Sequence, residues 1–321
     1  MTTQTLSENQ DRAEALAVIN RARLEMQKAC EAAVSQKRRS TGPPVVKETV
    51  YRAELATGLA AWQEMISELI DSRELTWRLF LRDFTARFRQ SALGYVWAVV
   101  PVLVTVATFS WLNRANVLPI KGTLLPYPLF VLLGMIVWQL FAGGLTNTTQ
   151  SLVGASALIT KINFPRETLV FAAFGQALFE IVIRAVLLIA AFALYHIAPC
   201  WTIILVPLTL IPLCLFTLGL GFLCALVNGI LRDVGQIILF MLTFWMFLTP
   251  VVYPAPTGHS NSLIFALNPI SPFVVAAQDL TSRGYLTQPV PLAIASGVSL
   301  LVFLLGWRIF HLTETRIAER I

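Results

Sequence analysis

The chain has 321 residues, of which 56% are hydrophobic and only 13% are charged. Soluble domains carry roughly 25% charged residues, so this composition excludes an ordinary soluble protein and indicates one embedded in a membrane. The net charge of +6 does not indicate a nucleic-acid partner, because basic and aromatic residues are not gathered on any soluble module large enough to read bases.

Residues 1–72 are predicted to form a cytoplasmic N-terminal arm. Within it, residues 8–36 are rich in Ala, Glu, Gln and Arg and have only a narrow apolar stripe, and the run from Lys37 to Pro44 ends the helix that they would form. This helical segment is either a solvated appendage or a segment that docks on a partner. The narrow stripe favours the appendage.

A basic amphipathic helix is expected over residues 73–90, directly before the first long apolar run. On a helical projection its apolar side chains fall on one side and its arginines on the other. Such a helix lies along a membrane surface, with its apolar face among the headgroups and its arginines near anionic lipid. The apolar side holds Trp77, Phe80, Leu81, Phe84 and Phe88, and the polar side holds Arg78, Arg82, Thr85 and Arg89.

Residues 91–321 are predicted to form an all-α transmembrane domain. Only eleven Asp, Glu, Lys or Arg residues lie between Ser91 and Trp307, which leaves windows long enough for spans of roughly 20 apolar residues. Turn signals around Pro199 and Pro254 divide the two longest windows. Six spans result, at about 91–112, 128–147, 168–195, 201–227, 235–253 and 289–310.

The distribution of Lys and Arg predicts the orientation of these spans. Eleven such residues lie near the span ends on one side and three, Arg114, Lys121 and Arg283, on the other. Because cytoplasmic loops are enriched in Lys and Arg, we expect both termini in the cytoplasm.

Several kinds of site are missing from the sequence. The chain has no phosphate-binding motif G-x-x-x-x-G-K-[ST] and no H-E-x-x-H, so it is not expected to hydrolyse ATP or to be a metalloenzyme. Asp233 and Asp279 stand alone, which does not indicate a metal-diphosphate enzyme. We therefore expect a chain that is not an enzyme and binds no cofactor of its own.

One cytoplasmic loop, residues 151–167, has apolar residues at near-helical spacing followed by a helix stop at Pro165. These side chains either enter a groove of a cytosolic partner, with Lys161, Arg166 and Glu167 at the rim, or pack on the underside of the bundle itself. The pattern alone leaves both possibilities open.

Candidate channel residues lie inside the predicted spans. Glu180 and Arg184 are four residues apart, in the favourable order for a helical ion pair, and an unpaired charge there would cost about 2.5–3.5 kcal/mol on insertion scales. The pair either lines a polar path or simply stabilises the bundle. Trp97, Trp138 and Tyr253 either stack on sugar rings or anchor the membrane interface.

Seven short motifs, taken in their order along the chain, give the sequence a resemblance to a known family. The chain resembles the membrane subunit of ATP-binding-cassette exporters of the ABC-2 type, in particular the permeases for O-antigen, capsule and teichoic acid polysaccharides. The similarity covers residues 75–310. The motifs are Arg82-Asp83-Phe84, Leu93-Gly94-Tyr95-Val96-Trp97, Tyr127-Pro128, Ile159 to Glu167, Arg232-Asp233-Val234, Pro250 to Pro254 and Leu267-Asn268-Pro269.

This resemblance implies a role for each motif. The helix at 73–90 would be the family's interface helix, and the loop carrying Ile159, Lys161, Phe164, Pro165, Arg166 and Glu167 would be its coupling helix on the ATPase subunit. Arg232 and Asp233 would form a second contact with that subunit. The outer segment from Pro254 to Gln288 would be a re-entrant helical pair that caps the channel exit.

The resemblance also implies an assembly and an activity. Two copies of the chain would form one channel above two ATP-binding subunits, which hold the ATP and Mg, in the bacterial inner membrane. The expected substrate is a lipid-linked polysaccharide. Alternatives are an ABC-2 exporter of a lipid or drug, a secondary transporter, which would need internal repeats that we do not find, or a membrane glycosyltransferase.

Overall fold

The computed structural model describes residues 24–26, 28, 31, 59–89, 94–117, 119–120, 122–159, 161, 164–255 and 267–317. The chain divides into two units, Met1–Arg52 and Ala53–Ile321. In the first unit the described residues are helical and exposed. The second unit contains the helix bundle and all of the candidate site residues.

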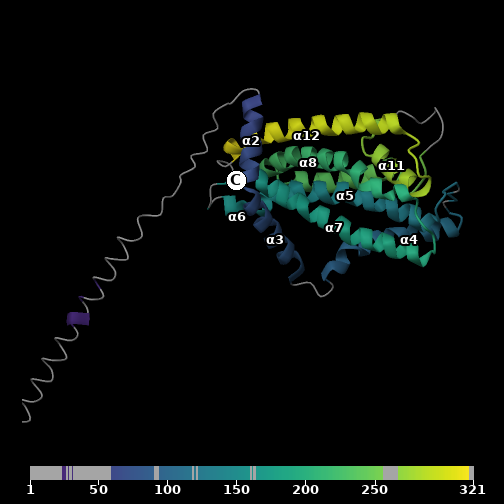
Figure 1. The fold of residues 1–321 in the computed structure, drawn as a ribbon, viewed down its shortest axis with the longest axis horizontal. Coiled ribbons are helices and arrows are strands. Elements are labelled where there is room, and N and C mark those ends of the chain that lie inside the picture. The colour runs from purple at the N-terminus through teal and green to yellow at the C-terminus, as the bar shows by residue number, and fades with distance from the viewer. Residues whose placement is uncertain are drawn as a thin grey trace, which may run out of the picture. The chain divides into compact units, whose positions relative to one another are not determined.

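Every regular element that the structure describes in the second unit is helical, and its described residues include no strand (Figure 1). The elements are α2 (Leu59–Asp71), α3 (Arg73–Arg89), η1 (Gly94–Ala98), α4 (Val100–Arg114), α5 (Tyr127–Gly154), α6 (Ser156–Ile159), α7 (Glu167–Leu194), η2 (Trp201–Leu205), α8 (Val206–Ile230), α9 (Val234–Leu248), α11 (Ser271–Ser282) and α12 (Pro289–Ile317).

Helix α2 belongs to the bundle and not to the arm. Its Met65 is fully buried, and its Trp62 meets Trp307 of α12 edge to face with ring centroids 6.0 Å apart. The boundary between the two units therefore falls at residue 52, earlier than the arm boundary predicted at residue 72. The polar composition of the arm concealed the two apolar residues that dock α2, buried Met65 and half-buried Trp62.

Four helical segments are long and apolar enough to cross a membrane within the described part of the chain. They are Tyr127–Gly154, Glu167–Leu194, Trp201–Ile230 and Pro289–Thr313. They match the predicted spans at 128–147, 168–195, 201–227 and 289–310.

The other two predicted spans form shorter helices. Residues 94–98 make a 3-10 helix that starts at Gly94 in a left-handed conformation (φ +49°), so α4 is left with 15 residues. Helix α9 also has 15 residues and ends at Leu248, two residues before Pro250. At 1.5 Å per residue such helices are about 22 Å long, less than the roughly 30 Å hydrocarbon core.

The outer segment predicted as a re-entrant pair contains one described helix, α11. This helix has 12 residues, nearly all buried, and it ends where the Asp279 carboxylate accepts a hydrogen bond from the backbone N–H of Thr287 (2.9 Å). Residues 256–266, which would supply most of the first half of the pair, lie outside the described residues.

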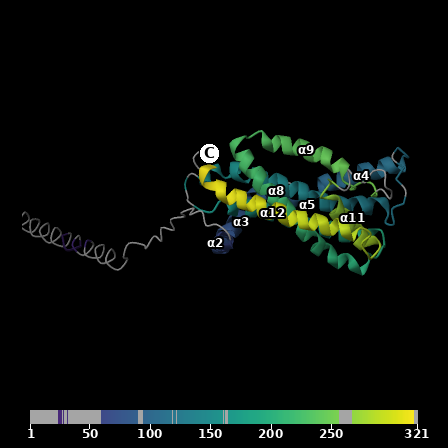
Figure 2. The ribbon, with the colours of Figure 1, turned by 90° about the horizontal axis from the view of Figure 1, so that it is seen from above.

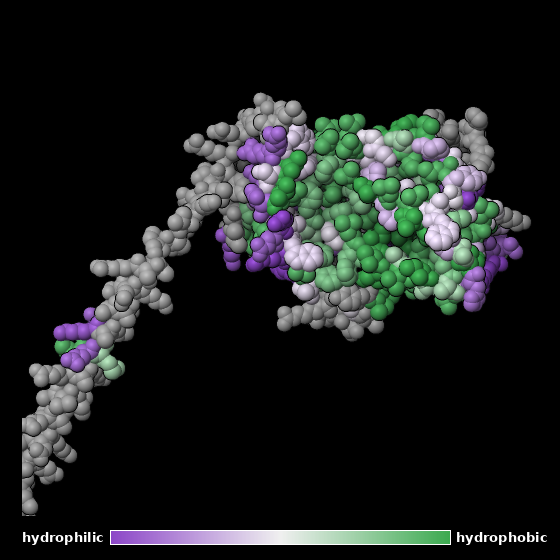
Figure 3. Space-filling model, viewed as in Figure 1, coloured by the Kyte–Doolittle hydropathy of each residue, from purple (hydrophilic) through white to green (hydrophobic). Residues whose placement is uncertain are grey.

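The surface of the second unit is apolar along the sides of the long helices and polar at both helix ends (Figure 3). One polar end gathers α2, the start of α3 and the end of α12, and the other lies beyond α4 and α11 (Figures 1 and 2). A bundle that exposes many large apolar side chains between two polar ends has the polarity expected in a bilayer.

Helix α8 and helix α12 approach each other through glycine backbones. A Cβ atom at Gly306 would lie 2.3 Å from the carbonyl oxygen of Gly219, and one at Gly219 would lie 2.6 Å from the backbone of Val302. Small residues allow this close packing, which stabilises helices in lipid where the hydrophobic effect between helices is weak. On the other side of α8, Gly221 leaves room for the side chain of Thr148 in α5.

We expect Gly306→Ala to destabilise the bundle, because the added methyl group would meet backbone atoms that cannot move away. Overpacking of this kind costs about 1–3 kcal/mol. Thermal unfolding of the detergent-purified chain measures the loss. Gly297→Ala on the same helix is the control, since a Cβ at Gly297 meets nothing within 4 Å; equal stability of the two variants would contradict the contact.

Candidate functional site

A cavity of about 410 Å³ lies within the bundle, where η1, α4, α5, α7 and α9 meet. Its lining mixes two tryptophans with amide, hydroxyl and charged side chains, in contrast to the apolar helix surfaces around it. The lining residues are Trp97, Ala98, Pro101, Trp138, Gln139, Ala142, Gly143, Thr146, Asn147, Glu180, Arg184, Leu239, Leu242, Thr243 and Met246.

The predicted ion pair lies in this cavity. An Nη2 atom of Arg184 is 2.7 Å from Oε2 of Glu180, and both side chains are more than nine-tenths buried. The Nε–H of Arg184 also donates to the carbonyl oxygen of Ala98 (3.2 Å), which connects α7 to η1. Pairing is confirmed, and it offsets the desolvation that two isolated buried charges would cost.

Helix α5 contributes a polar face that our sequence reasoning missed. Gln139, Gly143 and the adjacent Thr146 and Asn147 follow one another about one helical turn apart, and all four line the cavity. The Glu180 carboxylate lies over Gly143, where a Cβ atom would be 4.0 Å from Oε2. The signal was available as polar residues at i, i+4, i+7 and i+8 in an otherwise apolar span.

One polar atom of that face is left without a protein partner. The side-chain amide nitrogen of Asn147 is buried and has no hydrogen-bond partner among the described residues. A buried donor without a partner costs free energy. A ligand with hydroxyl oxygens could accept its hydrogen bond.

The aromatic candidates separate into two groups. Trp97, which is 57% exposed, and Trp138, which is buried, both line the cavity. Tyr253 does not: it follows α9, and its hydroxyl donates to the carbonyl oxygen of Phe247 (2.8 Å). The structure thus brings together Glu180, Arg184, Trp97 and Trp138 and leaves Tyr253 apart.

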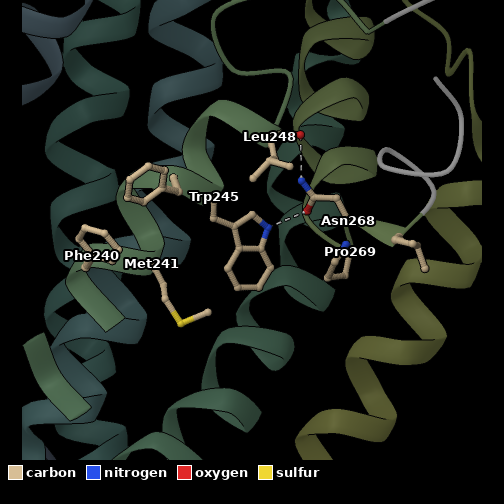
Figure 4. Close-up of a pocket in the computed structure, with 8 residues that line it drawn as sticks. Phe240, Met241, Trp245, Leu248, Asn268 and Pro269 are labelled. Atoms are coloured by element: carbon tan, nitrogen blue, oxygen red, sulfur yellow. Dashed lines mark hydrogen bonds between the residues drawn. The ribbon is translucent and has the colours of Figure 1, made fainter. Parts of the chain in front are cut away.

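A second hollow, of about 540 Å³, lies on the outer face of α9 and is almost entirely apolar (Figure 4). Its Trp245 donates its indole N–H to Oδ1 of Asn268 (3.1 Å), and the Asn268 amide donates to the carbonyl oxygen of Leu248 (3.3 Å). These bonds fix the chain after α9 to the start of α11. The hollow contains none of the candidate site residues.

The loop predicted to contact an ATPase begins with the short helix α6. Lys161 is exposed, and Ile159 and Arg166 are half-buried. Thr160, Ile162 and Asn163 lie outside the described residues. Among the predicted contact residues of this loop that the structure describes, Lys161 is the exposed one.

Three of the predicted contact residues are buried in the bundle, which corrects the expectation that Phe164 enters a groove of the partner and that Glu167 lies at the rim of that groove. Phe164 is 8% exposed and packs in a cluster with Met65, Leu79 and Phe222. Pro165 is buried beside it. Glu167 is 1% exposed, and its Oε1 lies 2.9 Å from Nδ1 of His311 in α12. For these residues the alternative of packing on the underside of the bundle is correct.

Arg232 and Asp233 are exposed in the turn between α8 and α9. The turn is held to the end of α5 by Asn228, whose amide donates to the carbonyl oxygen of Thr149 and whose Oδ1 accepts from the N–H of Gly235, both at 2.9 Å. Because α6 follows α5 directly, the exposed residues of both turns lie at the same end of the bundle.

Helix α3 packs on α7 through part of its aromatic face. Phe80 covers Gly175, and Phe84 meets Phe179 edge to face with ring centroids 4.5 Å apart. Trp77 remains 58% exposed. Leu79, which the amphipathic projection left out, is the most deeply buried residue of this helix.

The polar side of α3 faces outward. Arg78 pairs with Glu74 at 2.5 Å, and Arg82 pairs with Asp83 at 2.7 Å. The side chains of Phe88 and Arg89 lie outside the described residues. The described arginines are thus exposed, as the amphipathic pattern predicts.

The end of the bundle that holds α2 and the end of α12 also contains a group of carboxylates around His311. Burial raises the pKa of Glu68 above its ordinary value of 4.5, and the nearby Glu167 and Glu64 raise it further, while His311 acts in the opposite direction. Ionised Glu68 therefore opposes the docking of α2. Among the described residues, no three His, Cys, Asp or Glu side chains form a cluster that could hold a metal ion.

We expect Glu68→Gln to raise the thermal stability of the chain at neutral pH. Because the folded-state pKa is raised, folding is favoured when this carboxyl is protonated at low pH. That contribution to the free energy of unfolding is lost as the pH rises through the folded-state pKa. The gain should shrink as the pH falls toward 4.5. Melting curves across this range test the sign, and Asp71→Asn, an exposed carboxyl of the same helix, is the control; a gain independent of pH would contradict the assignment.

Comparison with known proteins identifies the family to which a chain with this structure belongs. The ABC-2 type transporter family matches residues 74–280, a stretch from α3 to α11 that includes the cavity, the α6 loop and the turn at Arg232. More than half of the chain is matched.

Individual relatives are similar over most of their length. The O-antigen export system permease protein RfbA of Myxococcus xanthus is 28% identical over 264 residues, which cover 80% of this chain and 99% of that protein. A protein of the same name from Klebsiella pneumoniae is 23% identical over 241 residues, 74% of this chain and 91% of its own. The polysialic acid transport protein KpsM of Escherichia coli is 20% identical over 247 residues, covering 74% and 92%. With its family match and its apolar bundle, the chain belongs to the ABC-2 type transporter family.

Proposed function

We propose that the chain is the permease subunit of an ABC exporter that moves a lipid-linked polysaccharide, such as O-antigen or capsule, across the bacterial inner membrane. The family supports this proposal, and so do the relatives, which are named as an O-antigen export system permease protein and a polysialic acid transport protein. The observation that carries it is the cavity lined by Trp97, Trp138 and the polar face of α5. Aromatic faces and amide groups together suit a ligand that is both ring-shaped and rich in hydroxyl groups.

In this proposal the chain crosses the membrane six times, with both termini in the cytoplasm. The two additional crossings are η1 with α4, and α9 with the residues after it, which are short helices at the sites of predicted spans. A 15-residue helix can complete a crossing where neighbouring segments cover its ends. Helix α11, short and buried, is the second half of the proposed re-entrant pair at the outer exit.

The proposed assembly has two copies of the chain and two ATP-binding subunits. ATP and its Mg would be held by the partner subunits, and this chain would have no catalytic role. Exposed Lys161, Arg232 and Asp233, at the same end of the bundle, are the proposed contacts with the ATPase. Buried Phe164, Pro165 and Glu167 would connect those contacts to the core.

A proposed mechanism follows from the helices that connect the proposed ATPase contacts to the cavity. ATP binding would move the ATPase against α6 and the turn at Arg232, and these segments join directly to α5, α7, α8 and α9. Three of those helices line the cavity. Displacement at the cytoplasmic end would therefore change the width of the path that the sugar chain follows.

The ATPase contact is tested by charge reversal. We expect Lys161→Glu and Arg232→Glu to lower both co-purification of the ATP-binding subunit and polysaccharide export, while stability stays within about 0.5 kcal/mol of the parent because both side chains are exposed. Phe164→Ala is the contrasting variant, expected to lose about 3–5 kcal/mol of stability as a buried aromatic residue. Full export by both charge-reversed proteins would refute the contact.

The cavity is tested by removing its polar groups. We expect Asn147→Leu to reduce export of the polymer while leaving the complex with the ATPase assembled. Its thermal stability should be retained or increased, because an unpartnered buried donor is removed. Thr108→Val, at an exposed threonine on α4 outside the cavity, should leave export unchanged. Normal export by Asn147→Leu would exclude a role for the cavity in the transport path.

A further inference from the structure

A groove of about 560 Å³ lies on the outside of the bundle, between α2–α3 and the first half of α7. Its volume falls within the roughly 300–1,000 Å³ of typical ligand sites. Two of its walls are the exposed side chains of Trp77 and Leu178, so the groove is open to the surroundings. The lining residues are Leu69, Arg73, Thr76, Trp77, Phe80, Phe171, Ala172, Gly175, Leu178 and Phe179.

The lining is apolar apart from two residues of α3. The hydroxyl of Thr76 donates to the carbonyl oxygen of Ser72 (3.1 Å), so it is already hydrogen-bonded within its own helix. Arg73 is exposed and contributes the single charge among the described lining residues. The neighbouring carboxylate of Glu74 does not line the groove and pairs with Arg78 instead.

The position and length of the groove match one leaflet of a bilayer. Its floor runs along α7 from Phe171 to Phe179, about 12 Å at 1.5 Å per residue, compared with roughly 15 Å for half of a hydrocarbon core. Its lining begins at Arg73, where α3 starts, and continues along α7 to Phe179. Helix α3 starts at one polar end of the bundle, and the sides of the long helices are apolar (Figures 1 and 3). Trp77 stands at its side, as aromatic residues do at membrane interfaces.

We propose that this groove binds one anionic phospholipid, with an acyl chain along Phe171 to Phe179 and the phosphate group at Arg73. The charge of the lining selects a negative headgroup, and the depth of the groove places that headgroup at the membrane surface. The lipid would contact α3 and α7 together and so stabilise the interface helix against the span. This site is separate from the polysaccharide path and requires only that the chain be embedded in a membrane.

Fluorescence quenching by brominated lipids tests the proposal. The full-length chain is reconstituted in two kinds of phosphatidylcholine vesicle. One contains brominated phosphatidylglycerol, and the other contains the same fraction of brominated phosphatidylcholine. The chain has 8 tryptophans, so the fluorescence of Trp77 is obtained as the difference between the emission of the parent and that of Trp77→Phe. This substitution keeps an aromatic side chain at the wall of the groove. We expect brominated phosphatidylglycerol to quench the fluorescence of Trp77 more strongly than brominated phosphatidylcholine.

The charge at the groove is then removed. Arg73→Gln should lose the extra quenching by phosphatidylglycerol, whereas Arg78→Gln, an exposed arginine of the same helix that does not line the groove, should keep it. Both side chains are on the surface, so both variants should fold. Equal quenching by the two lipids in the parent, or an excess that persists in Arg73→Gln, would overturn the proposal.

Discussion

A bilayer supplies no water to the polar groups of the helices that cross it, so each polar side chain must find its partner inside the protein. The bundle meets this constraint mostly within single helices: Thr148, Thr217 and Ser299 each donate to a carbonyl oxygen of the preceding turn. Arg184 meets it partly through Glu180 of the same helix. Between segments, the requirement is met by Arg184 of α7 with Ala98 of η1, and by Asn228 of α8 with Thr149 of α5. The constraint is not met everywhere among the described residues: in the cavity, for example, the amide nitrogen of Asn147 has no described protein partner.

The end of the bundle that holds α2 and the end of α12 is built differently, as a cluster of aromatic and aliphatic side chains shared by helices α2, α3, α5, α7, α8 and α12. Phe164 from the loop, Leu79 from α3, Phe222 from α8 and Phe310 from α12 pack together with Met65 of α2. The ring of Phe222 lies 5.0 Å from that of Phe310, centroid to centroid. Tightly packed interiors transmit strain with little compression. A force applied at Lys161 would therefore reach the interface helix and α12 as well as the helices around the cavity.

Local patterns in the sequence predicted the features that depend on one helix. The spacing of Glu180 and Arg184 predicted their ion pair, and hydropathy predicted the four long spans. Features that depend on distant residues were missed. The pattern of the loop could not show that Glu167 meets His311, 144 positions away, or that Met65 draws α2 into the bundle. Periodicity identifies an apolar face, but only the packed structure identifies what covers it.

The backbone contact between Gly219 and Gly306 has a consequence for how the bundle can move. Helices whose main chains touch cannot slide without a clash, and Gly221 brings α5 almost as close to α8 through Thr148. Helices α5, α8 and α12 therefore keep fixed positions relative to one another and form one rigid wall. Helices α4 and α9 contact that wall through side chains, which can change rotamer. Widening of the path would be a movement of α4 and α9 away from an immobile α5, so the polar face of α5 would serve as a stationary track for a passing sugar chain.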